Sequence, residues 1–356
     1  MKFSVCIPNF NYAQYIGETL DSVLAQDADF EVIVADNAST DESVAVVEAR
    51  DDPRIRLLRN RWNVGFAGNL DRASRHATGD RMILLSSDDL AEPEALATYA
   101  RLADALGERS ERAIFASAQH VVDGEGTRTG ATDLEARLWE GAREDAALSA
   151  AVGQRVLRAD ASMLLRTSLK ALRTPFAFAT TCYPRGLYEA LEGYGGGPLI
   201  NPDKWFAWRL LSIADEAFFV EAPLFSYRVH ANNQGAIQQK SGALKHLMDQ
   251  YRATFDLEPS VLDAAGLDRD ALAAAFIEED IGLRGLAMVA DGNRALARRG
   301  LAFGTAAYPA LVRRSRSVAL LRVALALGPA GSAIAKRRRR SALARYRATP
   351  IQRDLG

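Results

Sequence analysis

Short apolar runs alternate with amphipathic segments along the first hundred residues. The run at 30–36 is rich in β-branched residues, and the run at 2–8 ends at a proline, which is typical of buried strands. The strands are predicted at 2–8, 30–36, 54–60 and 80–86. The segments between them carry apolar residues at helical spacing, and some open with capping residues. The helices are predicted at 15–26, 40–50, 63–79 and 92–106.

This alternation of strand and helix predicts an α/β fold, with βαβ units and a mostly parallel sheet flanked by helices. In such sheets, ligands bind outside the carboxyl ends of the strands. Candidate ligand groups follow three of the predicted strands: Pro8–Asn11, Asp36 and the pair Asp88–Asp89. We therefore expect one edge of the sheet to carry the functional site.

The second part of the chain is less regular. It is predicted to contain a strand at 113–123, a surface insertion at 127–147, a glycine-rich loop at 193–203 and a helix at 204–214. A further strand in 216–230 ends near Arg228 and His230, and from 241 onward the pattern is helical and alanine-rich. We expect a domain at 1–240 and a helical C-terminal extension at 241–356.

Composition narrows the class of protein. The chain has 356 residues, 48% of them hydrophobic, with a formal net charge of −1, so a large core is expected and no nucleic-acid partner. Two cysteines, Cys6 and Cys182, are too few for a disulfide framework or a cysteine-based zinc site. The N-terminus enters a predicted strand without a signal-type segment, and we expect a cytoplasmic protein.

Asp88 and Asp89 stand side by side after a buried strand, in "ILLSSDDLAEP". Adjacent buried carboxylates repel each other unless a cation or hydrogen-bond donors compensate. They are suitable oxygen ligands for Mg²⁺ or Mn²⁺, and equally suitable caps for the helix at 92–106. Asp36 leaves two interpretations as well, a turn aspartate or a buried acceptor for a base N–H.

Six motifs then occur in the order and spacing of family 2 glycosyltransferases, which the chain resembles over roughly 1–235. They are "CIPNFN", "VIVADNASTDES", "RNRWNVGFAGNLDRASRHATGD", "MILLSSDDLAEPEAL", "NPDKWFAWRLL" and "FSYRVHANN". The resemblance implies the GT-A fold, a Rossmann-like, mostly parallel sheet, and a nucleotide-sugar donor.

The resemblance also implies roles for individual residues in donor binding. The first motif implies that an aromatic side chain packs on the nucleotide base, which is physically reasonable because every base offers a π-face. Asp36 corresponds to the acid that hydrogen-bonds the base, and Asp41 to a structural turn position. The residues implied in nucleotide-sugar binding are Pro8, Phe10, Asn11, Asp36, Asn63, Gly65, Asp88, Arg209 and Arg228.

The metal and the catalytic base follow from the same resemblance. Asp89 is the preferred ligand of Mg²⁺ or Mn²⁺, with Asp88 as a second ligand or a sugar contact. His230 either ligates the metal, contacts the phosphates or is simply hydrogen-bonded. Asp203 corresponds to the general base of an inverting reaction, and N-capping of the helix at 204–214 is its structural alternative. The usual preceding glutamate is Pro202 here.

Two tryptophans and a basic tail are further features of the second part of the chain. Trp205 and Trp208 follow Asp203 and are expected in the core rather than as sugar platforms. Residues 313–347 combine an apolar segment, broken by Arg322, with "KRRRR". This pattern favours a helix at an anionic membrane surface, on the inner face of the cytoplasmic membrane, over one that spans the bilayer. A helix packed on the domain, followed by a solvated tail, is the alternative.

The resemblance therefore implies transfer of a sugar from a UDP- or dTDP-sugar to a hydroxyl of a glycan or lipid-linked acceptor, in cell-surface polysaccharide biosynthesis. Two other functions compete with it. A catalytically inactive sugar- or nucleotide-binding protein would be expected to lack the carboxylates, yet all of them are present. A sugar-phosphate nucleotidyltransferase would need a glycine-rich basic loop after the first strand, where this chain has "PNFNYAQY".

Overall fold

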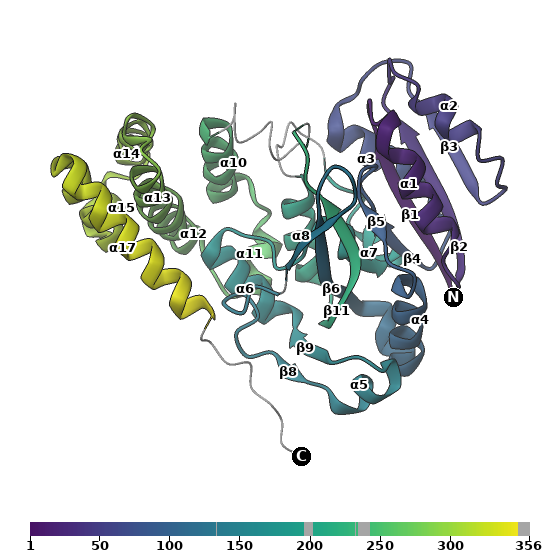
Figure 1. Cartoon of the computed structure of the whole chain (residues 1–356). Coiled ribbons are helices and arrows are strands. Elements are labelled where there is room, and N and C mark those ends of the chain that lie inside the picture. Colours follow the sequence, from purple (N-terminus) through teal and green to yellow (C-terminus); the bar gives the residue numbers. More distant parts are fainter. Residues whose placement is uncertain (133, 196–201, 232, 234–242, 348–356) are drawn as a thin grey trace.

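The computed structural model describes residues 1–132, 134–195, 202–231, 233 and 243–347 (Figure 1). Within these residues the strands form one mixed sheet with the order β3-β2-β1-β4-β10-β6-β11-β9-β8. Two short strands lie off this path, since β5 pairs with β11 and β7 pairs with β6. The sheet is mostly parallel in its first half, as the sequence predicts.

The parallel half of the sheet comes from the alternating N-terminal segments. Its strands are β1 (Lys2–Asn9), β2 (Asp29–Asp36), β3 (Ile55–Arg59) and β4 (Arg81–Leu84). Pairing is in register from Lys2 opposite Asp29 to Asn9 opposite Asp36, so β1 and β2 end together. This common end places the polar groups that follow the strands at one edge.

Helices cover both faces of this half. They are α1 (Ala13–Leu24), α2 (Ser43–Glu48), α3 (Gly65–Arg75) and α4 (Ala95–Leu106). Alternate strand residues face opposite sides: Cys6 and Ile33 pack in one core with Leu70 of α3. Val5 and Val32 pack in a second core with helices α1 and α4. The sheet is therefore buried on both faces, as a parallel sheet usually is.

The other half of the sheet is built from segments far apart in sequence. Its strands are β5 (Leu90–Ala91), β6 (Ala113–Val122), β7 (Arg128–Thr132), β8 (Arg143–Glu144), β9 (Val156–Asp160), β10 (Cys182–Pro184) and β11 (Glu216–Arg228). Its helices are η1 (Gly107–Arg112), α5 (Ala146–Val152), α6 (Ala161–Ala171), η2 (Phe178–Thr180), α7 (Arg185–Ala190) and α8 (Pro202–Ile213). The expectation that 127–147 is a surface insertion is wrong in its second part, because Leu138 and Trp139 are buried in the core.

The C-terminal extension is helical, as predicted. It contains α10 (Ala243–Asp256), α11 (Pro259–Ala265), α12 (Arg269–Phe276), the π-helix η3 (Ile277–Leu283), α13 (Arg284–Ala290), α14 (Arg294–Ala307), α15 (Pro309–Arg314), α16 (Arg316–Ala326) and α17 (Gly328–Arg347). Helices α11 and α12 pack against α6, and α11 also packs against α8. The core thus continues across residue 240, while α17 lies at the outer margin of the extension (Figure 1).

None of the helices in the described ranges combines the length and apolar character needed to cross a bilayer.

Candidate active site

The adjacent aspartates lie at the carboxyl edge of the parallel strands, between β4 and β5. Asp88 and Asp89 are only 6% and 2% exposed. Neither caps the following helix, because α4 has Glu94 at its N-cap position and no side-chain capping bond there. The capping alternative for this pair is therefore wrong, and other groups must compensate the two carboxylates.

Those groups come from the end of β11, as the motif order predicts. His230 Nε2 lies 2.9 Å from Asp88 Oδ2, and Asn233 Nδ2 donates to the same oxygen at 3.2 Å. The backbone N–H of Arg228 donates to Asp89 Oδ1 at 2.9 Å. The structure thus brings together the acid pair, Arg228 and His230, and adds Asn233, which the sequence analysis did not single out.

The guanidinium of Arg228 is buried and holds this junction together. It donates to the backbone oxygens of Asp88 at 2.9 Å and Gly124 at 3.1 Å, and to Glu18 Oε2 at 2.6 Å. It also lies over the Tyr15 ring, 5.0 Å from the centroid. These contacts give Arg228 a role in shaping the site; direct contact with the donor stays a prediction.

Burial makes this acid pair electrostatically unfavourable. It raises the pKa of Asp88, against the opposing effect of His230. Burial and the neighbouring Asp88 charge together raise the pKa of Asp89 well above its usual range. A divalent cation would favour the ionised form of both carboxyls, because an opposite charge lowers a carboxyl pKa.

The residues present fit a hard divalent cation such as Mg²⁺ or Mn²⁺, which prefers oxygen ligands and often retains donor phosphates. Across the described ranges, however, no group of three or more His, Cys, Asp or Glu side chains is placed to hold a metal ion. Asp88, Asp89 and His230 would therefore form an incomplete coordination sphere, which the diphosphate of a donor and water could complete.

A second group of predicted donor-binding residues lies at the paired ends of β1 and β2. Asp36 is buried, and it accepts hydrogen bonds from Asn9 Nδ2 at 2.9 Å, from the Ser39 hydroxyl at 2.6 Å and from the Ser39 backbone N–H at 3.0 Å. The turn interpretation of Asp36 is thus confirmed. These bonds leave lone pairs on the carboxylate that could accept a further hydrogen bond. Recognition of the nucleobase by Asp36 stays a prediction.

The segment that follows β1 lies beside this turn. Pro8 pairs with Ala35 inside the sheet, and Phe10 is exposed just beyond the strand. Asn11 adopts a left-handed backbone with φ of 58°, and its Oδ1 accepts from the Thr40 N–H at 2.8 Å. Phe10 is therefore displayed at the surface next to the Asp36 turn, as base stacking would require.

Asn63 and Gly65 belong to an asparagine network that holds the loop between β3 and α3. Asn37 Nδ2 donates to Asn63 Oδ1 at 2.9 Å, and Asn37 Oδ1 accepts from the Val64 N–H at 2.9 Å. Gly65, with φ of 80°, donates its N–H to Asn63 at 2.8 Å. Asn60 bonds Asn37 at 3.1 Å and also Asn69 of α3 at 2.9 Å.

Asn37, Asn60 and Asn69 were not predicted as site residues, although the sequence carries a signal for them. Each follows a strand or lies in the helix just beyond one, where buried amides are unusual unless they are hydrogen-bonded.

Asp203 lies in the first turn of α8 rather than at a cap position, since that helix begins at Pro202. It lines a cleft whose other walls are mostly apolar and aromatic: Leu84, Thr174, Phe176, Phe178, Thr181, Tyr183, Phe206, Ala207 and Leu210. Leu84 is the last residue of β4, so this cleft adjoins the segment that carries the acid pair. Burial raises the pKa of Asp203, while the positive charge of Lys204 opposes the rise.

Other residues of α8 have structural surroundings. Trp205 and Trp208 are buried in the core, as expected. Arg209 donates to the backbone oxygens of Gly193 at 2.8 Å and Leu191 at 2.7 Å, and it pairs with Glu258 of the extension at 2.9 Å. These contacts favour a role in anchoring the loop before α8, and donor binding by Arg209 stays a prediction.

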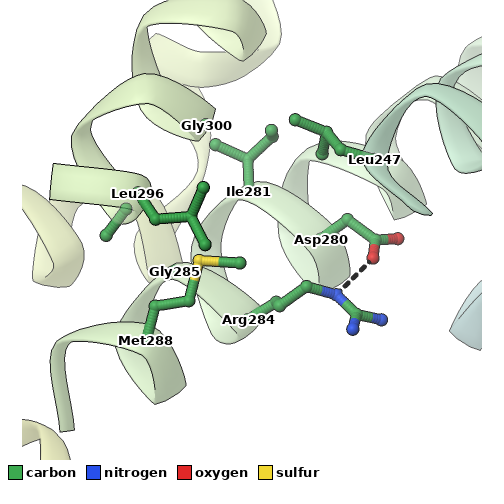
Figure 2. Close-up of a pocket in the computed structure, with 9 residues that line it drawn as sticks. Leu247, Asp280, Ile281, Arg284, Gly285, Met288, Leu296 and Gly300 are labelled. Atoms are coloured by element: carbon green, nitrogen blue, oxygen red, sulfur yellow. Dashed lines mark hydrogen bonds and ion pairs between the residues drawn. The ribbon is translucent and has the colours of Figure 1, made fainter. Parts of the chain in front are cut away.

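A second cavity lies in the helical extension (Figure 2). Asp280 and Arg284 form an ion pair of 2.7 Å on one side, and Leu247, Ile281 and Met288 line the rest. Its volume is about 10 Å³, room for roughly one water molecule. It contains none of the residues implied by the motifs, and we do not assign it to the catalytic site.

Sequence comparisons agree with this architecture. Residues 4–169 match the profile of Glycosyl transferase family 2. The chain is 35% identical over 109 residues to the poly(ribitol-phosphate) β-N-acetylglucosaminyltransferase TarS of Staphylococcus aureus, covering 29% of this chain and 19% of TarS. It is 36% identical over 99 residues to the succinoglycan biosynthesis protein ExoO of Rhizobium meliloti, covering 28% of each. The chain spans only 19–36% of the length of such curated relatives.

Solved structures extend the likeness to almost the whole chain. TarS residues 1–349 in complex with UDP-GlcNAc have a TM-score of 0.54 and 18% identity, covering 94% of this chain and 89% of that one. The mannosyltransferase PcManGT of Pyrobaculum calidifontis, in complex with GDP-Man and Mn²⁺, has a TM-score of 0.51 and 22% identity, covering 94% and 83%. The fold is that of the GT-A glycosyltransferases. Residues 4–169, just under half of the chain, match the family profile and therefore form a glycosyltransferase family 2 domain.

Proposed function

We propose that this chain is an inverting glycosyltransferase, which moves a sugar from a nucleotide-diphosphate donor to a hydroxyl of a glycan or lipid-linked acceptor in cell-surface polysaccharide biosynthesis. One observation carries the proposal. A buried acid pair with raised pKa values follows β4, and the last residue of that strand, Leu84, lines an apolar cleft that contains a single carboxylate, Asp203. The first suits a diphosphate with its cation, and the second suits an acceptor hydroxyl.

The donor end of the site lies along β1, β2 and β4. In this proposal the exposed ring of Phe10 stacks on the nucleobase and Asp36 accepts a nucleobase N–H, which favours UDP or dTDP. Asp89, with Asp88 and His230, would hold Mg²⁺ or Mn²⁺ against the diphosphate. When bound, such an ion neutralises charge that develops on the leaving nucleoside diphosphate.

The acceptor end is the cleft that contains Asp203. In this proposal its carboxylate takes the proton of the attacking hydroxyl, and attack on the face opposite the leaving group gives inversion. The raised pKa supports this role, because a general base works best when its pKa approaches the operating pH. The complexes of the similar proteins, TarS with UDP-GlcNAc and PcManGT with GDP-Man, support a nucleotide-sugar donor and leave its sugar open.

The competing functions are less well supported. An inactive binding protein has no need of the buried carboxylates, which are unfavourable in the absence of a cation. A nucleotidyltransferase would need a phosphate-binding loop after β1, where the chain instead has the Phe10–Asn11 turn. An exposed apolar surface on α16 and α17 further supports a location at the inner face of the cytoplasmic membrane, where lipid-linked acceptors lie.

A panel of nucleotide sugars tests the proposal directly. UDP-, dTDP- and GDP-sugars are incubated with the protein in Mg²⁺, Mn²⁺ or chelator, and release of the nucleoside diphosphate is measured. We expect metal-dependent turnover of at least one UDP- or dTDP-sugar, retained in Phe255→Ala and lost in Asp89→Ala. Binding of a nucleotide sugar without turnover, with or without glycan acceptors, would favour the inactive binding protein.

A further inference from the structure

Exposed aromatic side chains gather near the candidate site. Among the Phe and Trp residues that the structure describes, four are exposed: Phe10, Trp62, Phe66 and Phe255. The first three follow β1 or β3 at the carboxyl edge of the sheet. Trp62 is 67% exposed and Phe66 is 37% exposed. Exposed apolar rings gathered at one place on a protein surface commonly mark a binding site.

Trp62 is displayed on a fixed loop. The residues on either side of it are anchored, since Asn60 bonds Asn37 and Asn69, and Asn63 bonds Asn37. The backbone N–H of Asn60 also donates to the backbone oxygen of Asp36 at 2.8 Å. The loop is therefore ordered before any ligand arrives, which lowers the entropy lost when a ligand binds the ring.

Phe66 connects this loop to the cleft of the proposed base. It lies in the first turn of α3, and its ring centroid is 5.9 Å from that of Phe178. Phe178 lines the cleft that contains Asp203. Phe66 is thus in ring contact with one wall of the cleft that also contains the carboxylate. Phe10 lies beside Asp36 instead, on the side where a base is expected.

We propose that Trp62 and Phe66 form a binding platform for the carbohydrate of the acceptor, with a sugar ring stacked on the aromatic side chains and its reactive hydroxyl directed toward Asp203. This inference rests on the proposed function. The chemistry fits because a pyranose has an apolar C–H face, which an aromatic ring can cover, and a rim of hydroxyls that stays hydrated. The platform would select glycans over small alcohols as acceptors.

Trp62 is itself the reporter for a test. The other tryptophans, Trp139, Trp205 and Trp208, are buried, so acrylamide should quench chiefly Trp62 fluorescence. Tetrasaccharides of β-1,4-linked glucose, β-1,4-linked N-acetylglucosamine and α-1,4-linked glucose are titrated in the presence of UDP and Mn²⁺. We expect at least one to protect Trp62 from acrylamide, with a measurable dissociation constant.

Substitutions test whether the aromatic platform itself binds the glycan. Phe66→Ala should raise the dissociation constant of the protecting glycan by roughly 2- to 12-fold, the range expected for one aromatic contact. Phe66→Tyr should retain it, and the matched control Phe255→Ala, an exposed aromatic on α10, should leave it unchanged. Affinity for UDP, measured by calorimetry, should be the same in all three variants and shows that they are folded.

Two results would overturn the inference while leaving the proposed function intact: no tetrasaccharide protects Trp62 although UDP binds, or Phe66→Ala weakens UDP binding as much as glycan binding. The second result would assign the platform to the nucleotide. Failure of the parent protein to bind any nucleotide or nucleotide sugar would instead overturn the proposed function, and the inference with it.

Discussion

At the scale of the residue, the candidate site places charged groups where the protein alone does not stabilise them. Asp88 and Asp89 are buried side by side, and Asp203 is partly buried in a mostly apolar cleft. Sites of function commonly contain such groups, because the environment that suits the chemistry is unfavourable for the empty protein. This conflict can be measured separately for the metal site and for the base.

For the metal site, Asp89→Asn should stabilise the metal-free protein at neutral pH while weakening nucleotide binding. A carboxyl whose folded-state pKa is raised above its unfolded value disfavours the folded state once pH exceeds the unfolded value, because the buried group must then ionise. Asparagine removes the charge and retains the acceptor for the Arg228 N–H. We expect the free energy of unfolding at pH 7 to increase by about 1 kcal/mol, which a higher melting temperature would show.

The pH dependence supplies the control for this prediction. The gain from Asp89→Asn should shrink as pH falls and vanish below the ordinary pKa of an aspartate, where both forms are neutral. Calorimetry should also show that Mn²⁺ no longer strengthens UDP binding in the variant. A variant less stable than the parent at pH 7 would contradict the electrostatic account.

For the base, Asp203→Asn should lower the transfer rate by about 10²–10⁴-fold, the usual contribution of a general base. Donor affinity should change little, because Asp203 lies in the cleft and not beside the acid pair. Melting temperature should not fall, since the variant removes a charge that burial disfavours. A near-parental transfer rate, measured with a true acceptor, would place the base elsewhere, and His230 would be tested next.

At the scale of the element, the sequence pattern was most informative where secondary structure is local. The strands predicted at 2–8, 30–36, 54–60 and 80–86 are observed as Lys2–Asn9, Asp29–Asp36, Ile55–Arg59 and Arg81–Leu84. The second half was harder, because its strands pair across long sequence separations and leave no periodic pattern. Burial of Trp139, for example, depends on Phe176 and Phe219, which are remote in the chain.

For the site, too, local pattern identified the charged residues but not the contacts they make. Asp88, Asp89 and Asp203 stand out as charged residues next to apolar segments. Arg209 was predicted to bind the donor, and the sequence did not indicate that its guanidinium also donates to Leu191 and Gly193. Hydrogen-bond partners of this kind depend on how loops fold back, which no local pattern specifies.

The loop between β3 and α3 gives a prediction for an element. Asn37→Ala removes both the acceptor and the donor at the centre of the asparagine network, so the Val64 N–H and the side chains of Asn60 and Asn63 lose a partner. We expect a loss of about 1–3 kcal/mol in the free energy of unfolding, the usual cost of leaving buried polar groups without a partner. Urea denaturation would measure it.

A control for Asn37→Ala is Ser162→Ala, which removes one side-chain hydrogen bond to Asp160 at the exposed start of α6 and should cost less. Acrylamide quenching of Trp62 should also increase in Asn37→Ala, because the loop that displays it loses its anchor. Unchanged quenching and stability would show that the network does not order the loop.

At the scale of the whole molecule, the extension is joined to the catalytic part by a shared core and by buried charges. Lys204, the residue after Asp203, is buried and contacts Gln250 of α10. Burial lowers the pKa of Lys204, while Asp249 and Asp280 oppose the effect. Asp203, the proposed base, is thus adjacent on α8 to a lysine that the extension binds. We therefore expect the catalytic part and the extension to unfold together.

The outer helices of the extension present a surface suited to an anionic membrane. Val323 and Leu327, one helical turn apart at the end of α16, are 48% and 49% exposed, and Ile334 of α17 is also exposed. Arg322, Lys336 and Arg338 are exposed near these positions in the sequence. Exposed apolar side chains flanked by cations match an interfacial helix, which buries its apolar face among headgroups.

The prediction for this surface is binding to anionic vesicles that requires both its apolar and its charged residues. The parent protein should sediment with vesicles containing phosphatidylserine and not with neutral vesicles. Salt should weaken the binding because it screens the attraction between the cations and the anionic headgroups, which is about 1 kcal/mol for each cation near the surface. The double variant Val323→Ser, Leu327→Ser should bind about tenfold more weakly or worse, since two apolar side chains no longer enter the interface.

The matched control Met248→Ser, Phe255→Ser changes two exposed apolar residues of α10 and should bind like the parent. Equal sedimentation of both double variants would assign the attraction to charge alone, and a parent protein that ignores anionic vesicles would contradict membrane association.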